Sequence, residues 1–187
     1  MKRILSYFVL MTLAALSAQV SAITDEVSLL LLRSTNTLYV KKGRFILKSF
    51  KVALGSGGRY AKLREGDGRT PTGKYKIMQI RESGRFHLFM QLNYPNIQDA
   101  KRALIEKNIT QAEYRLVLDA HIFGRQPPQN LMLGGAIGIH GIGLENKEKV
   151  KIHQNIDWTE GCIALRNAEV EELSEYVSVG TVINIVE

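Results

Sequence analysis

Thr159-Glu160-Gly161-Cys162-Ile163-Ala164-Leu165-Arg166-Asn167 combines a turn, a short strand and the start of a helix. Gly161 lets the backbone approach another molecule closely, because it has no side chain. The apolar run Ile163–Leu165 predicts a short buried strand. Asn167 is a residue type that caps helices, and Val170, Leu173 and Val177 follow at helical spacing. The stretch therefore places Cys162 at the rim of a strand, just before a helix.

The segments around this stretch are mostly short strands separated by Gly-rich turns. Val27–Leu54 predicts a strand followed by a hairpin that turns at Lys42-Gly43. The remaining segments are a long loop at Gly55–Gly73, strands at Lys74–Ile80, Gly134–Leu144 and Thr181–Val186, helices at Ile97–Lys107 and Ala168–Val177, and a polar loop at Glu145–Ile156. This mixture predicts a mainly β domain, similar to a β-sandwich, with two peripheral helices.

The N-terminus has the three parts of a secretory signal. Lys2 and Arg3 precede an apolar stretch over residues 4–16, and small residues follow up to Ala22. The apolar stretch is shorter than the ~20 residues of a membrane span, although an N-terminal anchor is the alternative. We expect residues 1–22 to be a signal peptide, residues 23–187 to be one domain, and the protein to be exported to the periplasm or cell envelope.

The charge favours an anionic partner. The chain carries +7, and residues 1–22 hold two basic and no acidic residues, which leaves +5 on residues 23–187. An exported protein meets little nucleic acid, so we expect no nucleic-acid partner. Cell-wall polymers with carboxylates fit better, and the alternative is that the charge only favours solubility.

Cys162 is the only cysteine. Structural cysteines of exported proteins come in pairs, so a single thiol is either functional or buried and inert. At the rim of a strand it would be exposed, and the backbone N–H groups of Gly161 and Cys162 could form an oxyanion hole.

A thiol nucleophile needs a base, and the chain has four histidines. His87 and His121 have the surroundings of ordinary strand or loop residues, and His153 lies in a charged segment and is expected to face solvent. His140 lies in the alternating stretch Ile137–Ile142, on the face opposite Ile137 and Ile139. We expect an open imidazole there, and beside it a Cys162 thiol with some thiolate character near neutral pH.

These motifs resemble the signature of the L,D-transpeptidase catalytic domain, also called the YkuD domain. The matching parts are His140-Gly141, the stretch Thr159–Asn167 after a variable loop, Thr70–Tyr75 and Val179–Val182. The resemblance implies the fold of that family. It also implies that Cys162 is the nucleophile, that His140 is the general base and acid, and that the Gly141 carbonyl orients His140.

The resemblance further implies a reaction on peptidoglycan stem peptides through a cysteine thioester, without a cofactor or metal. The same resemblance implies that carbapenems act as inhibitors, and we expect the protein to be a monomer. Many members carry His and Arg where this chain has Glu160 and Ala164. Arg166 is the substitute that we expect to bind a stem carboxylate, together with Thr159. An L,D-carboxypeptidase, or a hydrolase that detaches wall-bound proteins, is the alternative within the family.

Two alternatives lie outside the family. A zinc peptidase would use His140, His153 and Asp157 as ligands, but the sequence has no His-Glu-x-x-His pattern and Cys162 would have no role. A non-catalytic wall-binding module would simply bury Cys162.

Overall fold

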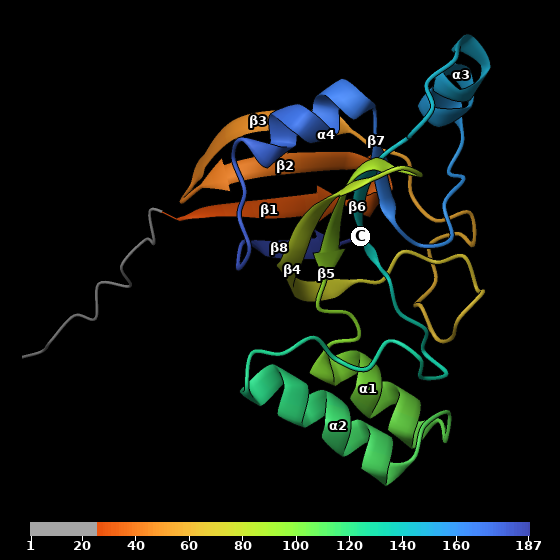
Figure 1. Cartoon of the computed structure of the whole chain (residues 1–187). Helices are drawn as coiled ribbons and strands as arrows, with labels where there is room; N and C mark the ends of the chain where they lie inside the picture. The colour runs from red at the N-terminus through yellow and green to blue at the C-terminus, as the bar shows by residue number, and fades with distance from the viewer. Residues whose placement is uncertain (1–25) are drawn as a thin grey trace, which may run out of the picture.

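The computed structural model describes residues 26–187, so the expected signal peptide lies outside the described part (Figure 1). The strands are β1 Val27–Leu32, β2 Thr37–Lys42, β3 Phe45–Lys51, β4 Gly73–Ser83, β5 His87–Leu92, β6 Gly138–Gly141, β7 Ile163–Leu165 and β8 Val182–Val186. The helices are α1 Ile97–Ile105, α2 Gln111–Ile122, α3 Lys147–Asn155 and α4 Asn167–Ser174, with a 3-10 turn at Arg33–Thr35. No helix among residues 26–187 has the length and apolar character needed to span a bilayer.

All eight strands belong to one sheet, in the order β3-β2-β1-β8-β4-β5-β6-β7. The two edges of this sheet meet, because Ala53, just after β3, pairs with Ala164 on β7. A second bridge joins Gly55 to Thr159. The sheet therefore curls into a nearly closed barrel, and the predicted mainly β fold is confirmed.

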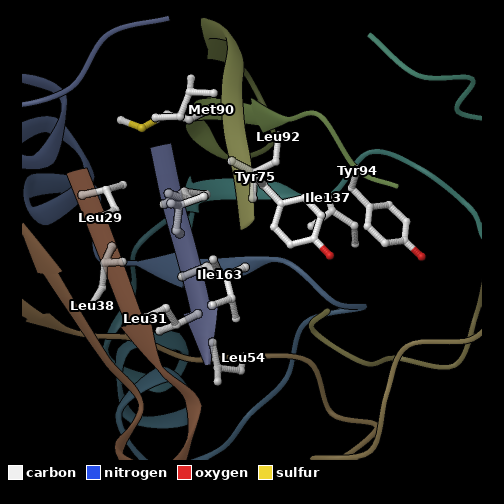
Figure 2. Close-up of a cluster of buried hydrophobic side chains, with 14 of the residues drawn as sticks. Leu29, Leu31, Leu38, Leu54, Tyr75, Met90, Leu92, Tyr94, Ile137 and Ile163 are labelled. Atoms are coloured by element: carbon white, nitrogen blue, oxygen red, sulfur yellow. The ribbon is translucent and has the colours of Figure 1, made fainter. Parts of the chain in front are cut away.

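The inner face of the sheet holds one hydrophobic core. Leu29 and Leu31 on β1 alternate with half-buried residues, as expected for a strand with one face inward. Figure 2 shows part of this core, which extends from Leu29 past Ile163 to Tyr94. Burial of Ile163 and Leu165 fixes β7, and thereby the position of the cysteine that precedes it.

Residues 26–187 form four α-helices where the sequence predicted two. The helices α1 and α4 and the β2–β3 hairpin lie where expected. The helix α2 was not predicted, although Thr110 and Glu113 form a capping box at its start. The prediction of a loop over Glu145–Ile156 is wrong, since α3 occupies most of it. His153 is the residue of α3 that becomes buried, so this helix has no apolar stripe by which the sequence could reveal it.

Candidate active site

The turn before Cys162 is closed by one hydroxyl. Thr159 Oγ1 donates to the Cys162 carbonyl at 2.7 Å and accepts from the Gly161 N–H at 3.1 Å. Thr159 is only 4% exposed, so the expectation that it contacts substrate is wrong, and its role is to shape the turn. The Gly161 N–H is likewise already paired, which corrects its expected place in an oxyanion hole. The Cys162 N–H remains the candidate donor.

The Gly-rich loop over residues 55–73 packs directly against this turn. Gly161 has φ +128°, and an added Cβ would lie 2.7 Å from the Arg69 carbonyl oxygen, so only glycine fits. The Thr70 hydroxyl accepts from the Gly55 N–H at 2.9 Å. The guanidinium of the buried Arg33 donates to the Thr70 carbonyl at 2.9 Å. These contacts hold the loop in place beside the turn that precedes Cys162.

Strand register places Cys162 and His140 on the same face. In the parallel pair of β6 and β7, Ile139 lies opposite Ile163 and His140 lies opposite Ala164. One step back along both strands, Cys162 lies level with Gly138. Because side chains alternate between faces, Cys162 shares the face of His140 and is its diagonal neighbour on the adjacent strand. Two groups that are 22 positions apart in the sequence are thus brought together.

The Cys162 thiol is held in its neutral form. The side chain is partly exposed, and Sγ donates to the Ala136 carbonyl at 3.4 Å. Desolvation raises the pKa of Cys162 to about 11, against smaller opposing effects of the Gly138 backbone, Lys62 and Arg85. The expected thiolate character near neutral pH is therefore corrected, because a thiol with a pKa of about 11 is almost entirely protonated at pH 7.

His140 is not the open imidazole that was expected, since it is only 2% exposed. The Phe86 ring centroid lies 4.2 Å from the imidazole centroid, and Phe89 and Trp158 surround it further. Burial lowers the pKa of His140 to about 4, against the opposing bond to Gly141. The β4–β5 hairpin carries Phe86 over the ring, and that long-range contact leaves no trace in the sequence near His140.

The tautomer of His140 follows from its partner. Nδ1 lies 2.7 Å from the Gly141 carbonyl oxygen. A carbonyl can only accept, so this bond places the hydrogen on Nδ1 and leaves Nε2 as an unprotonated base. The arrangement expected for Gly141 is present in the structure.

Asn167 holds the segment that carries this carbonyl. Its Nδ2 donates to the Gly143 carbonyl at 2.6 Å, and its Oδ1 accepts from the Gly143 N–H at 3.0 Å. The expectation that its side chain caps a helix is therefore wrong. Arg166 is the N-cap of α4, and the Glu169 carboxylate accepts the Arg166 N–H. The Asn167 amide instead clamps the turn that follows β6.

The other predicted residues lie nearby in different roles. The exposed Arg166 pairs with Glu145 at 3.3 Å, so its guanidinium is shared with a carboxylate. His153 was expected to face solvent but is buried, and its Nδ1 accepts from Trp158 Nε1 at 3.4 Å. Ala164 is fully buried beside His140, which leaves no room there for the arginine that many family members carry.

Sequence reasoning missed Arg85 and Phe86, at the tip of the β4–β5 hairpin, and Ala136. Arg85 lies over the Phe86 ring, with 4.8 Å from Cζ to the ring centroid, and Phe86 in turn covers His140. Ala136, whose carbonyl accepts from the thiol, has φ +52°, which is unusual for a residue with a side chain. The stretch Phe86-His87-Leu88-Phe89 was the only signal, and it is equally typical of an ordinary strand.

The metal-site alternative finds no support in the arrangement of its three residues. His140 Nδ1 faces a carbonyl, His153 Nδ1 accepts from Trp158, and Asp157 accepts from the Leu54 N–H and the Asn36 amide. Within residues 26–187, no three His, Cys, Asp or Glu side chains are grouped as metal ligands.

Comparison with known proteins identifies the domain type. A family model described as the L,D-transpeptidase catalytic domain, YkuD, matches residues 27–185. A protein of Escherichia coli (strain K12) that is named as an L,D-transpeptidase, YafK, is 35% identical to this chain over 69 residues. That match covers 35% of this chain and 28% of the relative.

Solved structures share the fold at low sequence identity. Bd1075 of Bdellovibrio bacteriovorus matches with a TM-score of 0.55 and 17% identity. Pgp2 of Campylobacter jejuni, described as a helical cell shape determining protein, matches with a TM-score of 0.55 and 20% identity. Each match covers 87% of this chain and 48% of the other, so the chain spans about half the length of these two proteins.

Proposed function

The chain belongs to the YkuD family of L,D-transpeptidase catalytic domains, and from this premise we propose that it acts on peptidoglycan stem peptides through an acyl-enzyme on Cys162. The observation that carries the proposal is the shared sheet face of Cys162 and His140, with Nε2 of His140 left unprotonated. A nucleophile beside an oriented base is the arrangement that acyl transfer requires.

In the first half-reaction, Sγ of Cys162 attacks the carbonyl carbon of the third stem residue. Both groups are neutral at pH 7, so the thiol proton moves to Nε2 of His140 as the S–C bond forms. The thiol must first exchange its bond to the Ala136 carbonyl for one to Nε2. The Cys162 N–H is the proposed donor to the oxyanion. When the C–N bond breaks, His140 returns the proton to the leaving amine, and a thioester remains.

In the second half-reaction, an acceptor attacks the thioester. An amine forms a new C–N bond and yields a cross-link, whereas water yields a trimmed stem. In each case the acceptor loses a proton through His140, and Cys162 regains it as the C–S bond breaks. Transfer is the proposed main reaction, and carboxypeptidase or detaching hydrolase activity is the alternative. Arg166 is the proposed cation for a stem carboxylate, in exchange for its contact with Glu145.

The proposal is tested by mass spectrometry of purified tetrapeptide stems after incubation with the protein. Transfer predicts loss of the terminal residue together with gain of an added acceptor amine. Hydrolysis predicts the same loss with gain of water. Unchanged stems under both conditions, with correctly folded protein, would refute the proposed chemistry.

The location of this reaction is also a proposal. The basic and apolar N-terminus supports export, and the periplasm or cell envelope is where stem peptides occur. We propose that the protein acts there as a monomer. Sequencing the N-terminus of protein recovered from that compartment would show whether cleavage follows Ala22.

Carbapenems should acylate Cys162, because they are acyl donors and the thiol is partly exposed. The expected result is a mass increase of one inhibitor molecule per chain, located on the peptide that contains residue 162. The Cys162→Ala variant is the matched control and should show no increase. An equal increase in both proteins would mean that the inhibitor reacts elsewhere.

Asn167→Ala should lower kcat about tenfold with little change in KM, a loss of ~1.4 kcal/mol in transition-state stabilisation. The reason is that the clamp on Gly143 holds the segment that orients His140, whereas it does not contact substrate. Asn146→Ala is the control, since that residue caps α3 and its loss should cost stability alone. A similar fall in kcat for both variants would contradict the positioning role.

A further inference from the structure

The tip of the β2–β3 hairpin exposes three consecutive apolar side chains. Phe45 is 63% exposed, Ile46 59% and Leu47 45%. Successive strand residues point to opposite faces, so the tip exposes apolar side chains on both faces of the hairpin. The next positions turn back to the domain, where Lys48 pairs with Glu172 and Phe50 is buried. Such a contiguous apolar run is rare on a protein surface without a partner.

Cations flank the same tip. Lys41 and Lys42 precede the turn at Gly43, and Arg44 follows it. The Arg44 guanidinium lies 5.2 Å from the Phe45 ring centroid, so charge and apolar surface are presented together. Within residues 41–47 there is no acidic residue. Segments that enter the headgroup region of an anionic bilayer typically combine basic residues with exposed Phe, Ile or Leu, as this tip does.

The position of the tip in the fold is compatible with membrane contact. Val27, at the start of β1, pairs with Lys42, so the first residues of β1 lie beside the tip (Figure 1). The tip is also at the opposite end of β3 from Ala53, which pairs with β7 next to the Cys162 turn. Contact at the tip would therefore leave the active site uncovered.

From these observations we infer that the β2–β3 hairpin tip, residues 41–47, inserts into the surface of a membrane that contains anionic lipid. Phe45, Ile46 and Leu47 enter the boundary between headgroups and acyl chains, while Lys41 and Arg44 contact lipid phosphates. The contact holds the domain at the membrane with its active site free to reach a polymer nearby. The inference does not depend on the proposed chemistry.

The test measures insertion at one residue of the full chain, so binding through the N-terminal segment does not confuse it. In a Cys162→Ala background, Ile46→Cys is labelled with an environment-sensitive fluorophore. The control is Leu116→Cys on α2, which is 55% exposed in the wild type and distant in the fold. Vesicles contain either phosphatidylcholine alone or a mixture with phosphatidylglycerol.

The expected result is a blue shift and increased intensity at position 46 with phosphatidylglycerol vesicles, and no change at position 116. Adding Lys41→Glu and Arg44→Glu should remove most of this response. Equal responses at positions 46 and 116, or none at position 46, would overturn the inference. A concentration-dependent shift at position 46 without vesicles would also overturn it, because the exposed edge strand β3 would then be pairing with a second copy.

Discussion

Cys162→Ala should lower turnover of tetrapeptide stems by at least about 10⁴-fold, because it removes the sulfur on which the proposed covalent intermediate forms. The side chain is small and partly exposed, so its loss leaves the core intact. The measurement is steady-state release of the terminal residue, together with a thermal melt of the same variant. Within residues 26–187 the structure offers no second thiol that could substitute.

Cys162→Ser is the companion variant. It replaces the thiol with a hydroxyl, which is much harder to deprotonate than a thiol, so activity should remain far below that of the wild type. Near-wild-type turnover in the alanine variant would show that the reaction proceeds without an acyl-enzyme on this residue. Loss of activity accompanied by loss of folding would instead require the serine variant to decide the question.

The strands that bring Cys162 and His140 together could be predicted because their signals are local. The apolar run at Ile163 predicts β7 directly, and the alternation around Ile139 predicts a strand there, although β6 spans only Gly138–Gly141 of the expected Gly134–Leu144. The polar surroundings of Thr159 and Gly161 predict a turn, although not that one hydroxyl satisfies both sides of it. Local sequence therefore indicates which segments carry Cys162 and His140, whereas their roles stay a prediction.

The environment of the pair could not be predicted, because distant segments create it. Phe86 lies 54 positions before His140 and covers it only through the pairing of β5 with β6. The burial of Ala164 and the closure of the barrel depend on Ala53, from the other end of the sheet. These contacts make His140 buried instead of open, and they make both groups neutral at pH 7.

His140→Ala should lower kcat/KM by about 10²–10⁴-fold, which is the usual contribution of a general base. The substitution removes the acceptor of the thiol proton, and the raised pKa of Cys162, about 11, means that few thiolates form without it. His153→Ala is the matched control, since that imidazole is also buried but is bonded to Trp158. The reverse order of effects would assign the base to His153.

The pH profile tests the same base in the unmodified protein. A general base is active when unprotonated, so kcat/KM should rise as the pH increases through the lowered pKa of His140, about 4, and stay level through pH 7.

Phe86→Ala removes the ring that covers the imidazole and admits water, so the acidic limb of the pH profile should move up toward the ordinary histidine pKa of about 6.5. Phe123→Ala, at an exposed position after α2, is the control and should leave the limb in place. An acidic limb near pH 6.5 in the wild type, unchanged by Phe86→Ala, would show that burial by the hairpin does not set the basicity of His140.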